Sequence, residues 1–353
     1  MPQYELWGHT VDIEIPKDIF PSDEKQKELD EILGHPTHGF FEGTFGGKKL
    51  HYRKHLPANN AKPKALVIWQ HGIHGESGFG MKCPTPDGKF RYTNFAMRVR
   101  TMTEQHGFAV YAHDQLGHGY SEGARFLIPS GKWQINRDDL IQFAKDVVCK
   151  EYPDVPLFLC GDSYGGCLVL HAGREFQDHP ELVNNQFAGI LLNAPAIIGD
   201  LPPAPVVALL RRLAVWTPTW TPFFMPHPVS SERIWKELEP REYYSNKNDG
   251  LSKGGKPFCL GTALGLLTAL ESVRADIIPG FTAPFSINHG TKDYAVLMEG
   301  SEFMMEHAKT PKEDAVLNKI PDGYHDMYSE LNAEEILDLE IKWIQQQLDK
   351  QNK

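Results

Sequence analysis

Long hydrophobic runs are missing from this sequence. A membrane-spanning helix needs about 18 uninterrupted apolar residues, and the nearest approach, VVALLRRLAVW at 206–216, is broken by Arg211 and Arg212. The first residues, MPQYELWGHTVDIEIPKD, lack the basic segment and apolar run of a secretory signal peptide. We therefore expect a cytoplasmic protein that does not span a membrane.

The sequence also has few cysteines, and its basic residues are fewer than its acidic ones. The five cysteines are odd in number and form no C-x-x-C pair, so a reduced compartment is favoured over a disulfide framework. The 36 basic residues are outnumbered by 46 acidic ones, a formal charge of −10. We do not expect nucleic acid as the main partner, because binding a polyanion usually needs a basic face. No pattern indicates an oligomeric state.

Alternating strand and helix patterns begin near residue 65. Short apolar runs, typical of buried parallel strands, occupy 65–70, 108–113, 157–160, 189–194 and 283–289. Helical patterns such as NRDDLIQFAKDVVCKEYP and YGGCLVLHAGREFQ lie between them. This alternation predicts an α/β fold with a mostly parallel central sheet flanked by helices.

The alternation stops between residues 199 and 282. This segment opens with a stretch rich in Pro, Trp and Phe and closes with the helical pattern FCLGTALGLLTALESVRADI. We interpret 199–282 as a helical cap inserted late in the sheet. Residues 39–198 and 283–353 then form the core, and residues 1–38 form an N-terminal extension.

The pattern G-x-S-x-G, which can mark a serine nucleophile, occurs three times, around Ser121, Ser163 and Ser252. The chemistry requires a sharp turn between a strand and a helix, with small residues two positions before and after the serine. Only Ser163 follows a strand candidate, LFLC, and precedes a helix candidate. Ser163 is therefore the candidate nucleophile, with a packing turn as the alternative.

A serine nucleophile needs a base and an acid, which in this arrangement follow it along the chain. His325 lies in the polar loop PDGYHDMY after a short strand candidate, and Asp293 lies in the loop after the strand FSINH. We predict that Asp293 fixes the tautomer of the His325 imidazole. A solvated loop histidine is the alternative for His325, and Asp322 and Asp326 are too close to it in sequence to approach it easily.

Two backbone N–H groups should stabilise the oxyanion. One comes from Tyr164, directly after the nucleophile, and the other should follow an early strand. In WQHGIHGESG this position is Ile73. Metal binding by His71, His74 and Glu76 is the alternative, but no further ligand stands at a defensible spacing. We expect neither a metal nor an organic cofactor.

These segments together resemble the monoacylglycerol lipase and lysophospholipase branch of the α/β-hydrolases. The resemblance spans about residues 65 to 345 and rests on QHGIHGESG, YAHDQLGHGYSEGARF, CGDSYGG, LLNAPAI, INHGTKDYAV and DGYHDMYSE. It implies an eight-stranded, mostly parallel sheet with a helical cap, a triad of Ser163, Asp293 and His325, and oxyanion donors at Ile73 and Tyr164. It also implies that Ser121 is a structural loop residue.

The sequence departs from that family pattern in three places. Asp162 stands where the family more often has His or a small residue, the polar stretch MKCPTPDGKFR is inserted at 81–91, and the N-terminal forty residues are longer than usual. The charge of Asp162 could tune the site or merely face solvent, and the insertion and the N-terminal extension lie where they could alter access of substrate.

The expected reaction is hydrolysis of a lipid ester, most simply a monoacylglycerol or lysophospholipid, through an acyl-enzyme. The cap is rich in apolar side chains that could line an acyl pocket or touch a membrane surface peripherally; our candidates for the pocket are Leu209, Leu213, Trp216, Phe223 and Phe224. The alternatives are a small-ester esterase, a peptidase, or a non-catalytic relative that only binds ligands. The non-catalytic alternative is disfavoured because all three triad positions are filled.

Overall fold

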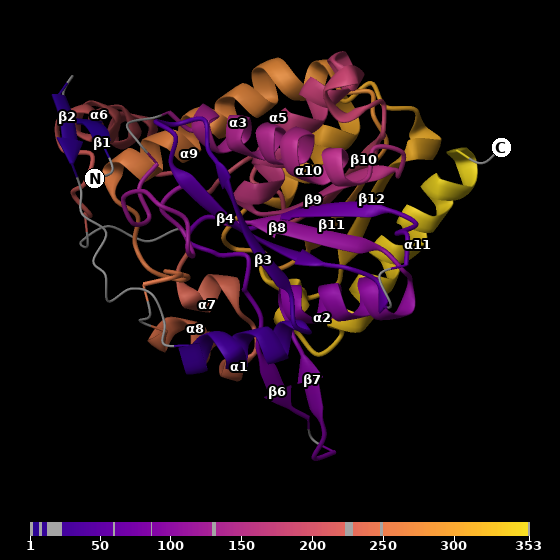
Figure 1. The fold of residues 1–353 in the computed structure, drawn as a ribbon. Coiled ribbons are helices and arrows are strands. Elements are labelled where there is room, and N and C mark those ends of the chain that lie inside the picture. The colour runs from indigo at the N-terminus through magenta and orange to yellow at the C-terminus, as the bar shows by residue number, and fades with distance from the viewer. Residues whose placement is uncertain are drawn as a thin grey trace.

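A sheet of eight strands forms the centre of the molecule (Figure 1). The computed structural model describes residues 3–6, 9–12, 23–58, 61–85, 87–128, 132–222, 229–247 and 250–351. In these ranges the strands of the main sheet run in the order β12-β11-β10-β9-β5-β8-β4-β3. The pairs β3–β4 and β4–β8 are antiparallel and all other pairs are parallel. The predicted α/β-hydrolase architecture is confirmed.

The main sheet is built from strands of five to seven residues. Their bounds are β3 (Thr37–Glu42), β4 (Lys49–His55), β5 (Leu66–Gln70), β8 (Ala109–His113), β9 (Leu157–Asp162), β10 (Phe187–Asn193), β11 (Phe285–Gly290) and β12 (Ala315–Ile320). Two small hairpins stand apart from it, β1 (Gln3–Leu6) with β2 (His9–Asp12) and β6 (Lys82–Pro84) with β7 (Phe90–Tyr92). The second hairpin falls in the inserted stretch 81–91 and projects from the body (Figure 1).

The helices cover both faces of the sheet and one of its ends. Their bounds are α1 (Asp23–Leu33), α2 (Asn94–Arg100), α3 (Gln134–Phe143), α4 (Cys149–Glu151), α5 (Tyr164–Asp178), α6 (Ala204–Trp216), α7 (Ser231–Ile234), α8 (Leu238–Asn246), α9 (Leu260–Ser272), α10 (Met298–His307) and α11 (Ala333–Gln351). Within the described ranges no helix combines the length and the apolar character needed to cross a bilayer.

Alternate residues of the central strands feed two separate cores. All five residues of β5 are buried; Leu66 and Ile68 pack with side chains of α3 and α5, whereas Val67 and Trp69 pack with those of α2 and α11. A strand covered on both faces must be apolar throughout, which explains the continuous hydrophobic run LVIWQ.

The parallel strands end together at one edge of the sheet. Gln70 of β5 pairs with Gly161 of β9, and Asp162 of β9 pairs with Asn193 of β10. Open parallel sheets bind ligands outside this carboxyl edge. The segment between β10 and β11 supplies α6, α7, α8 and α9, which lie at this end of the sheet, with α6 and α9 on one side and α7 and α8 on the other (Figure 1).

Candidate active site

Ser163 occupies the turn between β9 and α5. Its φ of 55° and ψ of −120° fall in a region that L-residues rarely adopt. A Cβ at Gly161 would lie 2.5 Å from the carbonyl oxygen of Gly165, and a Cβ at Gly165 would lie 2.1 Å from that of Gln70. The turn can therefore close only with glycine at both positions, which is the local geometry expected from the motif.

The other two serines of the motif occupy different surroundings. Ser121 is buried; its hydroxyl donates to the carbonyl oxygen of Asp114 at 2.6 Å and accepts from the N–H of His51 at 2.9 Å. Ser252 is buried in a loop after the last residues of α8. Neither serine follows a strand and begins a helix, and neither lines a cavity beside Ser163.

Asp293 and His325 are brought together from two different loops. His325 Nδ1 lies 2.7 Å from Asp293 Oδ2, and the other carboxylate oxygen accepts N–H groups of Ala295 and Val296 at 2.8 and 2.9 Å. His289, within β11, places its Nε2 3.3 Å from the same Oδ2. The carboxylate is thus fixed on both oxygens, so the proton of the His325 ring is held on Nδ1 and Nε2 remains free to act as a base.

Burial and charge act in opposite directions on this pair. Burial disfavours ionisation of Asp293, but the attraction of His325 and hydrogen bonds from His289 and His325 outweigh it and lower the pKa of Asp293. Burial likewise disfavours the charged form of His325, yet the neighbouring Asp293 carboxylate raises the pKa of His325 above its ordinary value of 6.5. The pair therefore stabilises the imidazolium that forms when a base takes up a proton.

The backbone around Ser163 supplies two N–H groups without backbone acceptors. In the described part of the chain, no carbonyl accepts a hydrogen bond from the N–H of Ile73 or Tyr164. The loop carrying Ile73 approaches closely, since a Cβ at Gly72 would lie 3.2 Å from Ser163 Cβ. Tyr164 is the first residue of α5, so the partial positive charge of the helix N-terminus lies beside Ser163.

A chain of buried polar side chains joins these two donor positions. His71 donates through Nδ1 to the carbonyl of Gly72 at 2.7 Å and accepts through Nε2 the N–H of Gln115 at 3.1 Å. The Gln115 amide donates to the carbonyl of His71 at 2.7 Å. Asn136 connects the Gln115 side chain to the hydroxyl of Tyr164, 3.3 Å from each. This network holds the loop of Ile73 against α5.

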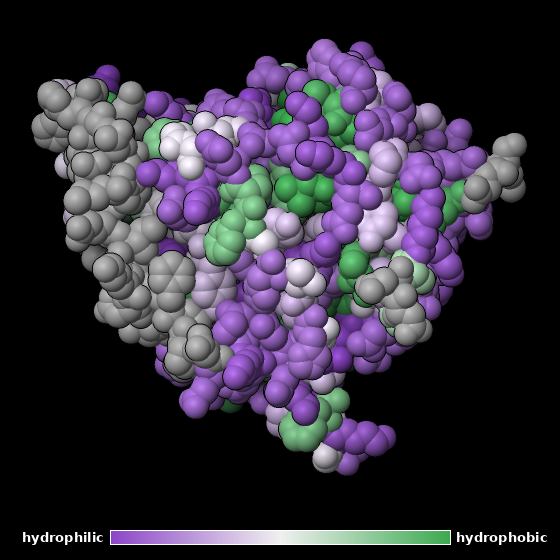
Figure 2. Space-filling view, viewed as in Figure 1, coloured by the Kyte–Doolittle hydropathy of each residue, from purple (hydrophilic) through white to green (hydrophobic). Residues whose placement is uncertain are grey.

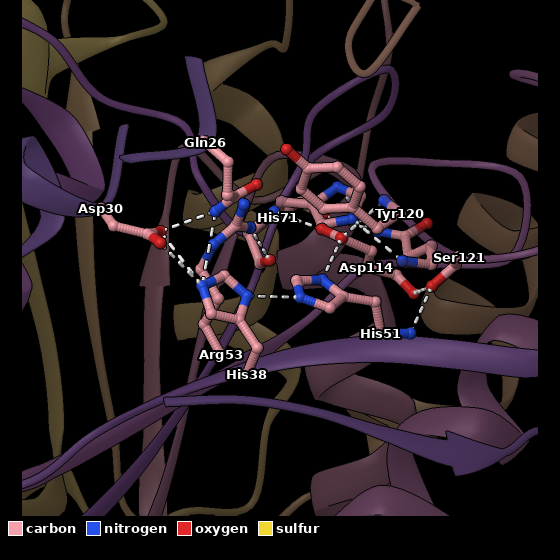
Figure 3. A network of polar contacts seen from close by, with 11 residues as sticks. Gln26, Asp30, His38, His51, Arg53, His71, Asp114, Tyr120 and Ser121 are labelled. Atoms are coloured by element: carbon pink, nitrogen blue, oxygen red, sulfur yellow. Dashed lines mark hydrogen bonds and ion pairs between the residues drawn. The ribbon is translucent and has the colours of Figure 1, made fainter. Parts of the chain in front are cut away.

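A second polar network, shown in Figure 3, fixes the loop that follows β8. The buried Asp114 carboxylate accepts the N–H groups of Ser77 and Tyr120 at 2.6 and 2.9 Å and contacts His51 Nδ1 at 2.7 Å. It therefore joins three segments, one of which continues the loop of Ile73. The two imidazole rings of His51 and His38 extend this network to the surface, where Asp30 of α1 lies 3.1 Å from His38.

Asp162, the unusual residue before the nucleophile, is held by cationic and neutral donors. Arg98 of α2 lies 3.0 Å from both of its oxygens, Trp69 Nε1 donates at 3.0 Å, and Asn193 donates at 3.1 Å. Arg98 is fully buried and also faces the buried Glu340 at 3.8 Å. Asp162 therefore does not simply face solvent, because its carboxylate is built into an internal ion-pair network.

Two cavities meet at Ser163. The larger, about 210 Å³, is lined by Tyr164 and by apolar side chains of α6 and α9, including Val207, Leu210, Ala214, Leu264, Leu267 and Leu270. The smaller, about 90 Å³, is lined by His325, by apolar side chains such as Phe79, Ile234 and Trp235, and by the polar side chains of Asn94, Asp162 and Asp326. Ile73 and Ser163 belong to both linings. The junction at Ser163 can hold an ester bond with its two halves on opposite sides.

The expected acyl-pocket residues differ from those that line the larger cavity. α6 presents Val207, Leu210, Arg211 and Ala214 to it, positions spaced by three and four residues along one helical face. Leu209 and Trp216 lie on the exposed side, with 58% and 62% of their surface accessible, and Leu213 is half-buried without lining the cavity. Phe223 and Phe224 lie outside the described residues. The composition of residues 199–282 predicts an apolar site. The position of each residue around the axis of α6, however, determines which side chains face the cavity.

The sequence alone did not identify several side chains that support the candidate site. His289, Gln115 and Asn136 are ordinary polar residues within strands, loops or helices, and only the fold brings them beside the candidate triad and oxyanion positions. The described residues contain no group of three or more His, Cys, Asp or Glu arranged to hold a metal ion. His71, considered above as a ligand, already uses both ring nitrogens in hydrogen bonds within the chain.

The fold, with a strained serine at the end of a central strand, defines the α/β-hydrolase class. The chain belongs to the family of serine hydrolases described as "Serine aminopeptidase, S33", whose model matches residues 87–332. It is 28% identical to monoglyceride lipase of Rattus norvegicus over 273 residues, which cover 76% of this chain and 78% of that protein. It is 30% identical to caffeoylshikimate esterase of Arabidopsis thaliana over 258 residues, covering 69% and 71%.

The solved structures similar to this chain include a soluble variant of monoglyceride lipase from Saccharomyces cerevisiae in complex with a substrate analog. The two superpose with a TM-score of 0.66 at 17% sequence identity, over 88% of this chain and 96% of the yeast chain. At this identity the superposition supports the fold. The chain is thus a serine hydrolase similar to the monoglyceride lipases in sequence and to lipases and esterases in architecture.

Proposed function

We propose that this protein hydrolyses carboxylic esters of lipids, such as a monoacylglycerol or lysophospholipid, through an acyl-enzyme on Ser163. The observation that carries the proposal is the junction, at the strained serine, of an apolar cavity with a smaller one whose lining includes polar side chains and His325. In this mechanism His325 removes the Ser163 proton and the alkoxide attacks the ester carbonyl. The N–H groups of Ile73 and Tyr164 stabilise the oxyanion.

The two cavities then bind the two halves of the ester. His325 protonates the leaving alcohol, so the alcohol departs on the His325 side, which is the smaller cavity. The acyl chain occupies the larger cavity between α6 and α9. Water next enters on the alcohol side, and His325 activates it to release the fatty acid and restore Ser163. None of these steps requires a cofactor.

In this proposal residues 199–282 act as a cap over the carboxyl edge of a core made of 39–198 and 283–353, with 1–38 as an N-terminal extension. The cap also presents apolar side chains to the outside, and these support reversible contact with a membrane that supplies the lipid. The large apolar residues exposed on or beside α6 are Leu201, Val206, Leu209, Val215, Trp216 and Trp220. By contrast, the face of the molecule seen in Figure 2 is mainly hydrophilic, with smaller hydrophobic areas.

Peptide or small-ester hydrolysis is the second candidate, favoured by the description of the family as an aminopeptidase and by the likeness to caffeoylshikimate esterase. The apolar lining of the larger cavity argues for a long acyl group instead, because burying a chain there removes apolar surface from water. A panel of monoacylglycerols, lysophospholipids, p-nitrophenyl acetate and aminoacyl amides separates the candidates. We expect the highest kcat/KM for a long-chain ester.

The nucleophile is tested by labelling with a fluorophosphonate probe. We expect the wild-type protein and Ser252→Ala to be labelled and Ser163→Ala to remain unlabelled. Ser121→Ala serves as a second control, with its fold checked by circular dichroism because Ser121 bonds to Asp114 and His51. Labelling of Ser163→Ala at the wild-type rate would show that another residue is the nucleophile.

A further inference from the structure

Polar side chains stand next to one another on four adjacent strands of the main sheet. Asn193 of β10 is in register with Asn288 of β11, and Asn288 is in register with Asn318 of β12. On its other side, Asn193 is in register with Asp162 of β9. Residues in register on parallel strands point to the same face of a sheet, so these four side chains form one row, which we call the polar row.

Hydrogen bonds run along the polar row in one direction. Asn318 donates to Asn288 at 2.9 Å, and Asn288 donates to Asn193 at 3.1 Å. Asn193 in turn donates to Asp162 at 3.1 Å. A carboxylate can only accept, so the nitrogen of Asn193 has to face Asp162 and its oxygen has to face Asn288. Aligned amides polarise one another and strengthen each bond, and the row ends at the carboxylate that precedes Ser163.

The side-chain amide of Asn193 uses its whole hydrogen-bonding capacity of two N–H donors and two acceptor lone pairs. Its second N–H donates to Glu340 of α11 at 2.7 Å, and the second lone pair of its oxygen accepts the hydroxyl of Tyr328 at 3.0 Å. These three residues are buried, with at most 3% of their surface exposed. Loss of this amide would therefore leave several buried polar groups without a partner.

Asn193 joins the turn of Ser163 to the loop of His325. Its side chain holds Asp162, the residue before Ser163, and its backbone carbonyl accepts the N–H of Ser163 at 2.9 Å. Its side-chain oxygen holds Tyr328, which follows His325 in the same loop. One residue thus contacts the segments that carry the candidate nucleophile and the candidate base.

The same amide is also connected to the strand that leads to the candidate acid. Asn288, which donates to Asn193, lies on β11, and the loop of Asp293 follows that strand. The backbone carbonyl of Asn288 accepts the N–H of Ala194 at 2.9 Å, so backbone and side-chain bonds join β10 and β11 at the same level. Proton transfer within a triad depends on distances of this kind, because a misplacement of about 1 Å can cost roughly 10²-fold in rate.

We propose that Asn193 is a positioning residue that holds His325 at the separation from Ser163 at which it can protonate the leaving alcohol. The inference rests on the proposed function, in which His325 first removes the Ser163 proton and then protonates the alcohol. The second transfer makes the stricter demand, because His325 has to reach an oxygen of the substrate as well as Ser163. Asp162, which departs from the family pattern, is the carboxylate that fixes the orientation of the amide.

The first test uses two esters of decanoic acid, with p-methylphenol and p-nitrophenol as the leaving alcohols. Neither ester has a free hydroxyl group, and the two rings are similar in size, so the lining of the smaller cavity contacts them alike. The leaving groups differ in basicity: p-nitrophenolate departs as a stable anion, whereas p-methylphenolate gains more from a proton donated by His325. The ratio of the two kcat/KM values therefore measures protonation by His325.

In Asn193→Ala, kcat/KM for the p-methylphenyl ester should fall roughly 10²-fold and that for the p-nitrophenyl ester about tenfold, so their ratio changes about tenfold. Asn193 lines the smaller cavity, so water can enter the space that the substitution leaves. An equal fall for both esters would overturn the inference, because a merely structural loss reduces the amount of active protein and cancels in the ratio. If the wild-type protein cleaves neither ester, the proposed function fails instead.

Tyr328→Phe removes one partner of the amide and tests the inference even if Asn193→Ala does not fold. The ring, whose centre lies 3.6 Å from the Arg98 guanidinium carbon, remains, whereas the hydroxyl bonded to Asn193 is lost. The ratio of the two esters should change several-fold in the same direction. Tyr111→Phe, which removes the hydroxyl of another buried tyrosine, on β8, is the matched control and should keep the wild-type ratio. A wild-type ratio in Tyr328→Phe would show that Asn193 does not act through the loop of His325.

The double variant shows whether Asn193 and Tyr328 act through the bond that they share. If they do, Asn193→Ala combined with Tyr328→Phe should have the same ratio of the two esters as Asn193→Ala alone, because that bond is already absent. A ratio that changes by the product of the two single effects would show that the residues act independently, and it would contradict the proposed role of Asn193.

Discussion

Two walls enclose the candidate site, and they are fixed to the molecule in different ways. The α7–α8 wall (residues 231–247) is tied by polar bonds to the loops of the site. Trp235 Nε1 donates to Asp326, next to His325, at 2.8 Å, and Lys247 lies 2.6 Å from the buried Glu76 in the loop of Ile73. The α6–α9 wall (residues 204–216 and 260–272) packs mainly through apolar side chains. Arg211 and Glu271 form an ion pair within it, and Thr262 is hydrogen-bonded to the backbone of Phe126 and Ile128.

We infer from this difference in fixation that the α7–α8 wall and the α6–α9 wall have different functions. Polar bonds are directional, so the α7–α8 wall can hold catalytic loops at fixed distances, and its loss should change the geometry of the reaction. Apolar contacts are non-directional and tolerate changes of shape, so the α6–α9 wall can vary with the acyl chain. We therefore expect substitutions in the first wall to affect stability and catalytic rate, and substitutions in the second to affect substrate range.

The largest effect should come from a substitution in the Asp293–His325 pair of the candidate triad. Asp293→Asn would keep the shape of the side chain but allow the wrong tautomer of His325, and kcat should fall by about 10⁴. Asp322→Asn, an exposed carboxylate that pairs with Lys292, is the matched control and should retain activity. Steady-state kinetics on a short soluble ester measure both. A fall of less than tenfold in Asp293→Asn would mean that another group orients His325.

The next effect contrasts one ion pair from each wall. Lys247→Met leaves the Glu76 carboxylate, which is fully buried, without its cation, and the free energy of unfolding should drop by about 3 kcal/mol. Arg211→Met breaks a pair whose side chains are 36% and 44% exposed, and the expected cost is below about 1 kcal/mol. Urea unfolding measures both values.

A double variant shows whether the expected loss of stability comes from the unpaired charge of Glu76 or from the loss of the Lys247 side chain itself. Glu76→Gln combined with Lys247→Met removes both charges and should recover part of the lost stability. If the Lys247 and Arg211 single variants are equally stable, the α7–α8 wall is not more firmly fixed than the α6–α9 wall, and the comparison is wrong.

A third prediction uses two neighbouring leucines of α6. Leu210 lines the larger cavity, whereas Leu209 is exposed. Leu210→Trp should fill part of the cavity and lower kcat/KM for a long-chain monoacylglycerol about tenfold relative to a short-chain one, because each excluded methylene forfeits about 0.8 kcal/mol of burial. Leu209→Trp is the control and should retain the wild-type preference. A similar shift in both variants would argue that the chain lies elsewhere.

The outward face of the same wall yields a smaller expected effect. Replacing the exposed Leu209 and Trp216 of α6 with serine should weaken binding to lipid vesicles several-fold, because it removes apolar surface that would enter the interface. Leu238→Ser with Tyr243→Ser makes a similar change on the exposed surface of α8 and should bind like the wild type. Vesicle flotation measures the bound fraction. Equal losses in both double variants would indicate nonspecific adhesion.

A feature of the fold or of the candidate site could be predicted from the sequence where residues close together in the chain determine it. The turn at Ser163 is encoded within a few residues, because Gly161 and Gly165 are needed to avoid collisions with nearby backbone. The strands were recognisable because burial on both faces leaves continuous apolar runs such as LVIWQ. These features require no knowledge of distant partners.

The supporting network around the site depends on contacts between distant parts of the chain. Arg98 approaches Asp162 from 64 positions away, and Asn193 approaches Glu340 from 147. No spacing rule connects such pairs before the fold is known. For α6 the limitation was different: apolar residues occur on several sides of the helix, so composition alone could not assign Leu210 to the cavity and Leu209 to the surface.

The smallest predicted effect concerns pH and distinguishes the charges on the two sides of the site. His325 must be neutral to accept the Ser163 proton, and its pKa lies above 6.5 because Asp293, with contributions from Asp326 and Asp162, outweighs the effect of burial. Activity should therefore fall as the pH drops through a midpoint above 6.5. Asp162→Asn removes one of the negative charges that favour the imidazolium, so the midpoint should move to lower pH.

The control for that shift lies on the α6–α9 wall. Arg212 is exposed on α6 and does not line the cavities, so Arg212→Met changes the net charge without altering the surroundings of His325. Its profile of kcat/KM against pH should coincide with that of the wild type. If the two variants shift the midpoint by equal amounts in opposite directions, the titration reports the net charge of the whole protein, because Asp162→Asn removes a negative charge and Arg212→Met removes a positive one. A shift confined to Asp162→Asn would show that charge beside His325 is set locally, by the carboxylates that line the smaller cavity.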